Sequence, residues 1–382
     1  MSMKKIKFTG LLTRKKAVRY LIYILFVCVF AVFVIKLNQV EKTELVVRTG
    51  QTFEKAKVVK ILQDNLEENG TRVGEQKVRV RMLTGVRKGE ELDITSSSGY
   101  LFGAACKPGM KVIVMQSVAG DSTVASVYTQ DREGVIYIFA LIYLLVLCLI
   151  GGKQGIKGCL GLVFTFFCVI FVYLPLVYLK YSPFWTAVFV CFITTLVTMY
   201  LIGGPTRKTC AATLGTLVGV ILAGVSAWCF SKASGISGYN VSDIETLMTL
   251  WNTNRIQVGG LLFSGLLISC LGAVMDVAMS ISSAIDEIYR QNLSLSRKEL
   301  FKAGLRVGRD MMGTDSNTLI LAFAGSSVST LLLDYSYNLP YQQIINSNNI
   351  GIAIMQGLAG SFGLVLSVPF TVLICTILFH KK

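Results

Sequence analysis

A stripe of small and polar residues recurs at intervals of three or four in one apolar segment of the chain. Its members are Gly265, Ser269, Gly272, Asp276, Ser280, Ser283 and Glu287. In a helix this spacing places them on one face. An ionised aspartate at the centre of a membrane costs roughly 2.5–3.5 kcal/mol on insertion scales, so such a face must meet protein or water. Asp276 is therefore a candidate proton or cation site, with Ser269, Ser280 and Ser283 along the same path.

Two other interpretations of Asp276 stay open. Asp276 lies about 18 residues from the outer end of its segment, which is roughly 27 Å at 1.5 Å per residue. At that depth it reaches the headgroup layer of the inner side, where a charge is tolerated. The second alternative is an internal salt bridge.

A second polar stretch opens the apolar run that follows. It contains Asp310 and Asn317, and the run itself is interrupted at Gly325. Transporters break helices at short, polar, glycine-interrupted spans to coordinate ions. Asp310 and Asn317 are therefore predicted to join Asp276 in an ion or substrate path, unless glycine and serine only let helices approach closely. The residues predicted to serve helix packing or gating are Gly272, Arg309, Gly313 and Gly325.

Catalytic and cofactor motifs are missing from the sequence. Gly235-Ile236-Ser237-Gly238 has the GxSG form of rhomboid serine proteases, but that mechanism needs a histidine base beside the serine. The sole histidine, His380, lies in the C-terminal tail. No HExxH, Walker A or GxGxxG motif is present, and the ten cysteines include no CxxC pair of the kind that binds zinc. The sequence predicts no enzyme activity, no metal site and no cofactor.

The elements that position these residues follow from the composition. Of 382 residues, 53% are hydrophobic and only 15% are charged, which is unlike a soluble domain. Several apolar runs approach or exceed the ~20 residues that a helix needs to cross ~30 Å of hydrocarbon. We predict a membrane all-α helical bundle of about eight transmembrane helices. Their ranges are Tyr20–Ile35, Val135–Ile150, Gly158–Leu179, Phe184–Ile202, Ala211–Phe230, Ile256–Ser283, Thr318–Leu333 and Gly351–Phe379.

Basic residues are distributed as a membrane topology requires. With the N-terminal head inside, 19 Lys and Arg lie on the inner side and three lie in short outer loops, as the positive-inside rule predicts. Both termini are thus expected in the cytoplasm. Residues 1–38 are the basic head and its uncleaved anchor, and residues 134–382 are the bundle. Ser296 and Glu299 have capping-box spacing, which predicts an amphipathic helix near 294–312 on the inner surface.

Residues 39–133 form the one large polar segment, which this topology places outside. Apolar and polar residues alternate, as in Lys77–Met82 and Lys111–Met115, which is typical of strands. Five or so short strands predict an inserted small extracytoplasmic β domain, either an OB-like barrel or a sandwich. Its 14 basic and 13 acidic residues nearly cancel and it lacks an aromatic stacking face, so nucleic acid is not an expected partner. Docking of a protein partner, or gating, is the expected role.

Three strings within and after the polar stripe are distinctive. Residues 271–280 read LGAVMDVAMS, residues 308–314 read GRDMMGT and residues 317–322 read NTLILA. They resemble the YibE/F family of bacterial multipass membrane proteins. The resemblance implies an anchor, an exterior domain and a bundle in the bacterial cell membrane, and no established activity. Asp276, Arg309, Asp310 and Asn317 match the family's motif, whereas Asp315 stands where a neutral residue is expected and carries less weight.

Two hypotheses about function remain. The first is a secondary transporter or permease, in which the polar stripe, Asp310 and Asn317 bind a proton or cation coupled to a small solute. The second is a membrane scaffold or signalling component that transports nothing and whose exterior domain recruits a protein partner. The two differ in whether water and solute reach the polar stripe.

Overall fold

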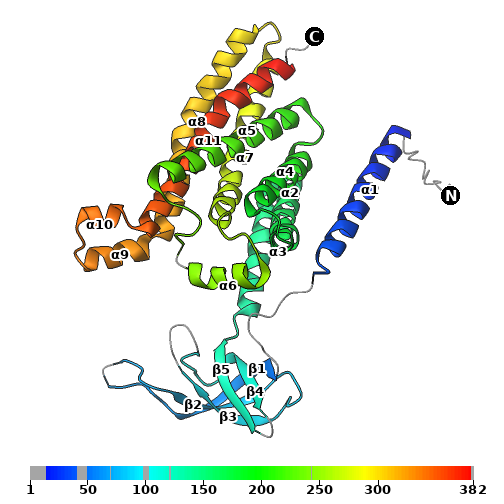
Figure 1. Ribbon diagram of the computed structural model, residues 1–382. Helices are drawn as coiled ribbons and strands as arrows, with labels where there is room; N and C mark the ends of the chain where they lie inside the picture. The colour runs from blue at the N-terminus through cyan, green and yellow to red at the C-terminus, as the bar shows by residue number, and fades with distance from the viewer. Residues whose placement is uncertain are drawn as a thin grey trace, which may run out of the picture. The chain divides into compact units, whose positions relative to one another are not determined.

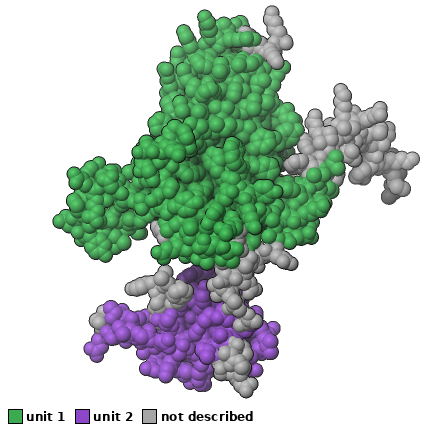
Figure 2. All heavy atoms as spheres, in the orientation of Figure 1, with its two compact units in different colours: residues 1–43, 150–382 green, residues 44–149 purple. Residues whose placement is uncertain are grey.

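The computed structural model describes residues 14–40, 50–68, 70–97, 103–119, 122–241 and 243–379. The predicted basic head up to residue 13 and the tail from His380 lie outside these ranges. The chain divides into two compact units (Figure 2), one of residues 44–149 and one of residues 1–43 and 150–382. The first unit holds all the described strands, and the second holds most of the helices.

The unit of residues 44–149 contains a closed five-stranded barrel with the strand order β1-β2-β3-β5-β4. Neighbouring strands are antiparallel except β3 and β5, which meet in parallel. This result confirms the predicted small β domain and selects the barrel over the sandwich; the strand order is that of an OB-type barrel. The strands are β1 (Gln51–Gln63), β2 (Gln76–Met82), β3 (Glu91–Ser96), β4 (Lys111–Ala119) and β5 (Ser122–Gln130).

Alternation along the strands builds the barrel core. On β2, Val78, Val80 and Met82 are buried while the residues between them point outward, because successive strand side chains face opposite sides of a sheet. The outward residues form cross-strand ion pairs. Arg79 donates two hydrogen bonds, of 2.6 and 2.7 Å, to the carboxylate of Asp93 directly opposite on β3. Such pairs hold one strand register against the next.

The helices of the chain are drawn in Figure 1. They are α1 (Arg14–Leu37), α2 (Glu133–Cys168), a π-helical turn η1 (Val169–Tyr173), α3 (Leu174–Tyr178), α4 (Pro183–Gly203), α5 (Arg207–Ser234), α6 (Ile244–Asn254), α7 (Leu261–Gln291), α8 (Arg297–Ser326), α9 (Val328–Ser336), α10 (Tyr341–Ile345) and α11 (Asn348–Phe379). α6 and α10 were not predicted as separate elements.

Among the described residues, five helices are long and apolar enough to cross a membrane, or six if the bent pair α8–α9 is one span. The protein is therefore a membrane protein, and the count of eight spans stays a prediction. One of the five is a continuous run of 46 residues, Glu133–Tyr178, which at ~1.5 Å per residue is about twice the hydrocarbon thickness. The backbone of Gly152, with φ 52° and ψ −132°, interrupts that run, because glycine readily adopts such angles. The predicted spans Val135–Ile150 and Gly158–Leu179 lie on either side of Gly152.

α8 joins two segments that the sequence analysis separated. The predicted amphipathic helix at 294–312 and the first part of the span Thr318–Leu333 form one helix that ends at Ser326. The predicted capping box is present, since Ser296 and Glu299 each bond the other's backbone N–H. The helix then bends by 56° into α9. Ser326 and Ser327 both donate side-chain hydrogen bonds back to the carbonyl of Phe323, at 2.7 and 3.3 Å, and such back-bonding bends helices.

Glycines let α5 and α11 pack closely at the centre of the helical unit. A Cβ atom built on Gly219 would lie 2.7 Å from Cβ of Ser367 and 3.1 Å from the carbonyl oxygen of Gly363. Gly363 in turn lies against Ala223. These glycines form a packing face, because a residue without a side chain lets two helix backbones approach closely.

Candidate functional site

The two faces of α7 differ sharply in chemistry. One face is apolar and buried; it includes Leu266, Cys270, Val274, Val277 and Ile281. The polar stripe lies on the opposite face, where Ser269, Asp276 and Ser280 are exposed and Ser283 is half-buried. Cβ atoms built on Gly265 and Gly272 would meet nothing within 4 Å. Among the described residues, no neighbouring helix therefore packs on the glycines of the stripe, and the space beside them is open.

α8 runs antiparallel to α7 and brings Asp315 to the level of Asp276. Gly304 of α8 lies against Ile285, and Gly308 lies against Ile281. About three turns beyond Gly308, Leu319 lies together with Cys270 of α7 against Gly360 of α11. Asp315 lies between these two levels on α8, and Asp276 lies between them on α7.

At this common level, the carboxyl group of Asp315 acts on that of Asp276 as a like charge. Such a pair binds a proton or a cation more readily than either group alone, because either species relieves the repulsion. Within the parts of the chain that the structure describes, the ion pairs do not include Asp276, Asp310 or Asp315. Asp276 therefore has no salt-bridge partner among these residues, and the salt-bridge interpretation finds no support there.

The other predicted path residues lie elsewhere on α8. Asp310 and Asn317 are exposed, and their positions in the helix are about 180–200° from that of Gly308, at 100° per residue. They therefore point away from α7, and the structure does not bring them to Asp276. Arg309, Gly313 and Gly325 are exposed as well, and Cβ atoms built on Gly313 and Gly325 would meet nothing within 4 Å. These two glycines therefore have no packing neighbour among the residues that the structure describes.

Asp315 is the residue that sequence reasoning undervalued. The sequence spacing already indicated its position, because Asp315 follows Gly308 by seven residues, or about two turns, and so shares the face that packs on α7. The neighbouring Ser316 adds to the polar character of this region. Its hydroxyl is buried with no hydrogen-bond partner among the described atoms, while its carbonyl accepts a 3.3 Å hydrogen bond from Ser361 of α11.

Serines of the stripe and beside it differ in their surroundings. The hydroxyl of Ser269 donates to the carbonyl of Leu266 at 2.9 Å, so its bonding is satisfied within α7. Ser282, which was not predicted, is fully buried and accepts a 3.4 Å hydrogen bond from the thiol of Cys375. Ser280 remains the exposed hydroxyl closest in sequence to Asp276 on the stripe.

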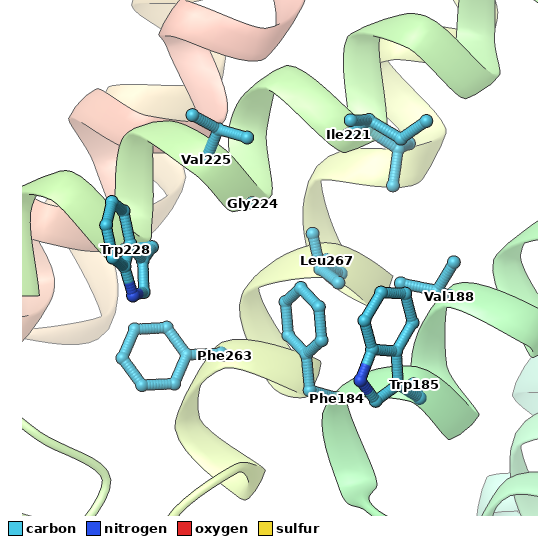
Figure 3. Close-up of a pocket in the computed structure, with 10 residues that line it drawn as sticks. Phe184, Trp185, Val188, Ile221, Gly224, Val225, Trp228, Phe263 and Leu267 are labelled. Carbon is cyan, nitrogen blue, oxygen red and sulfur yellow. The ribbon is translucent and has the colours of Figure 1, made fainter.

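Two cavities lie between the helices, both away from the polar stripe. A pocket of about 550 Å³ lies between α4, α5 and α7 (Figure 3) and is lined by apolar and aromatic residues. A second, of about 450 Å³, lies between α4 and α5 beside Tyr200 and Thr209. Neither is lined by Asp276 or Asp315. No group of three or more His, Cys, Asp or Glu suited to a metal occurs among the residues placed by the structure.

Comparison with known proteins connects the helical unit to one family. The family described as YibE/F-like protein matches residues 139–381, which include α7, α8 and both carboxylates. The barrel and α1 lie outside the matched range. No curated protein and no solved structure matches the chain. Since the match covers more than half of the sequence and the helices are those of a membrane protein, the chain belongs to the YibE/F-like family of membrane proteins.

Proposed function

We propose that the protein is a secondary transporter or permease that couples a small solute to a proton or a cation bound at Asp276 and Asp315. The observation that supports this proposal is the like-charge interaction of two carboxylates, one on α7 and one on α8, which have no ion-pair partner among the described residues. Ionisable residues inside membrane segments are costly, and they mark ion pathways when they line a water-filled route or a helix interface.

The exposed face of α7 gives the ion a route along the helix. Ser269 and Ser280 flank Asp276 on this face and supply oxygen atoms, and Gly265 and Gly272 leave space beside them. Hydroxyl and carboxylate oxygens are ligands for hard cations and for protons. The break between α8 and α9, where the helix bends by 56°, is the type of discontinuity that transporters use near their ion sites.

The topology that accompanies this proposal has eight membrane crossings in a bacterial cell membrane, both termini in the cytoplasm and the barrel outside. The charge asymmetry of the loops supports it, as does the interruption of the long α2 run at Gly152. Reporters fused after Lys157, Lys208 and Lys382 are expected to read cytoplasmic, and those after Arg132 and Asn338 exterior. A reversed reading at any of these positions contradicts the eight-crossing arrangement.

The experiment is a flux assay on purified protein in sealed vesicles. A pH or cation gradient is imposed and solutes are screened for gradient-dependent uptake, first with the wild type and then with Asp276→Asn and Asp315→Asn. Both variants should lose coupled uptake. Asp310→Asn is the matched comparison on α8, because its carboxylate points away from α7, and it should retain uptake. A folded wild type that moves neither ion nor solute would instead favour the scaffold hypothesis, in which the barrel recruits a protein partner.

A further inference from the structure

The cavity between α4, α5 and α7 has the lining of a site for a hydrocarbon chain. Figure 3 shows Phe184 and Phe263 between the indole rings of Trp185 and Trp228. Its volume of about 550 Å³ falls within the ~300–1,000 Å³ typical of ligand pockets. Trp185 is 68% exposed and Trp228 is 60% exposed, so the pocket opens onto the outer surface of the helical unit, which faces lipid in a membrane protein.

One basic residue of α5, Lys232, lies next to the pocket on the same face of the helix. Ile221, Val225 and Trp228 line the pocket, and Lys232 follows Trp228 by four residues, on the same side of the helix. Lys232 is exposed and takes part in none of the ion pairs found between described residues. The order along this face is therefore aliphatic, aromatic and then cationic. That order matches a lipid whose chain lies in hydrocarbon, whose glycerol region meets an indole and whose phosphate meets a lysine.

The start of α4 supplies a second attraction for an anion at the same end of the pocket. Phe184 and Trp185 belong to its first turn, directly after Pro183, and the side chain of Ser182 makes no capping hydrogen bond. Pro183 has no N–H, and the N–H of Thr186 already bonds the carbonyl of Ser182. The N–H groups of Phe184 and Trp185 have no partner within the helix, and they lie at the positive end of its dipole. These groups lie beside Trp185, and Lys232 lies one turn beyond Trp228, so positive charge from both helices is available to the polar end of an occupant.

Specificity at such a site must come from the polar end of the occupant. Lipid tails are as apolar as the side chains of the pocket, so a chain that moves from the bilayer into the pocket gains little from the hydrophobic effect. Filling the cavity adds van der Waals contact for any lipid alike. The headgroup, in contrast, distinguishes lipids, because an anionic phosphate near Lys232 is attracted and a zwitterionic headgroup has no net charge.

We propose that this pocket binds one acyl chain of an anionic phospholipid of the bilayer, with the headgroup phosphate held between Lys232 and the first turn of α4. The site involves a face of α7 other than the polar stripe, since Phe263 and Leu267 line it. The lipid-site proposal is therefore independent of the transport proposal.

Tryptophan fluorescence tests the site directly, because two of the three tryptophans in the sequence line the pocket. In the full chain with Trp251→Phe, the remaining indoles are Trp185 and Trp228. The protein is placed in vesicles that contain phosphatidylglycerol and phosphatidylcholine, with bromine atoms on the chains of one lipid or the other. Brominated phosphatidylglycerol is expected to quench at about fivefold lower mole fraction than brominated phosphatidylcholine.

Charge variants then test whether Lys232 causes the preference for phosphatidylglycerol. Lys232→Gln should bring the ratio of the two quenching curves to about one, whereas Lys208→Gln, at the opposite end of α5, should leave the fivefold ratio unchanged. Equal quenching by the two lipids in the wild-type background overturns the proposal, and so does a preference that survives Lys232→Gln.

A second measurement tests occupancy of the pocket itself. A Cβ atom on Gly224 would lie 3.4 Å from Leu267 and 3.5 Å from Phe184, which is ordinary contact, so Gly224→Ala fits and Gly224→Leu extends into the cavity. Native mass spectrometry of the detergent-purified chain should show one retained phospholipid in the wild type and in Gly224→Ala, and none in Gly224→Leu. Equal retention by all three variants contradicts binding at this site.

Discussion

Asp276 of α7 and Asp315 of α8 lie near enough to each other, on an antiparallel pair of helices, for their carboxyl groups to repel as like charges. The contact of Ile281 with Gly308, and the contacts of Cys270 and Leu319 with Gly360, set the register that brings the two aspartates to similar levels. Two carboxylates at one level of a membrane helix pair favour binding of a positively charged species between them. This relationship links the packing of α7 and α8 to the proposed ion coupling, and it can be examined through stability as well as through flux.

Removing one of the two charges should leave the fold intact. Asp276→Asn and Asp315→Asn each abolish the repulsion while keeping the shape of the side chain, so the melting temperature in detergent is expected to equal or exceed that of the wild type. Breaking a buried salt bridge would have the opposite effect, with a loss of about 3–5 kcal/mol. A sharp fall in melting temperature in either variant would mean that the carboxylate has a cationic partner after all.

Water should reach the exposed face of α7. In a background without the native cysteines, Ser280→Cys is expected to react with a membrane-impermeant thiol reagent, because its side chain is exposed on the polar stripe. Ser282→Cys is the matched control, since Ser282 is fully buried two residues further along the same helix. Labelling is followed by mass spectrometry on intact vesicles. An unreactive Ser280→Cys would show that lipid or protein covers the stripe and would weaken the transport proposal.

The glycines of the α5–α11 contact should tolerate no side chain. Gly219→Ala places a methyl group against Ser367 and the backbone oxygen of Gly363, and overpacking of this kind costs about 1–3 kcal/mol. Gly265→Ala is the comparison, because nothing lies within 4 Å of its Cβ position and alanine favours a helix by up to ~1 kcal/mol over glycine. Thermal unfolding in detergent should therefore rank Gly265→Ala at or above the wild type and Gly219→Ala below it.

The barrel should lose stability in acid partly through Asp93. The Arg79 guanidinium hydrogen-bonds the carboxylate and holds the pKa of Asp93 below its usual range. A carboxyl group with a lowered pKa in the folded state contributes stability that is present above its unfolded pKa of about 4 and disappears as pH falls through the folded value. Circular dichroism of the expressed segment 41–132, which we expect to fold alone as a β domain, measures this. As the pH falls from neutral to below the unfolded pKa of about 4, Asp93→Asn should lose less stability than the wild type.

A helical or disordered spectrum for that segment would contradict the expectation that the barrel folds alone. An Asp93→Asn domain with the same acid dependence as the wild type would show that the ion pair to Arg79 contributes nothing measurable, as is common for exposed pairs. Asp64 provides an independent check, because the hydrogen bond from Arg72 likewise lowers its pKa.

Properties that depend on residues close together in the sequence could be predicted from the sequence alone. Alternation in segments such as Lys77–Met82 predicted the strands of the barrel, and the spacing of Ser296 and Glu299 predicted the capping box that opens α8. The apolar runs and the distinctive strings around Asp276 predicted a membrane protein of this family. Each of these signals has a period of two to four residues or a contiguous stretch, so it acts within one element and needs no knowledge of what packs beside it.

Only the tertiary structure decided which residues meet. The sequence placed Asp276, Ser269 and Ser280 on one face of a helix. Whether another helix covers that face or leaves it exposed depends on how the helices cross. The register between α7 and α8 selected Asp315 as the neighbour of Asp276 and turned Asp310 and Asn317 away. That register is set by Gly304 and Gly308 fitting against isoleucines, and close packing of this kind is a property of two surfaces together rather than of either sequence segment alone.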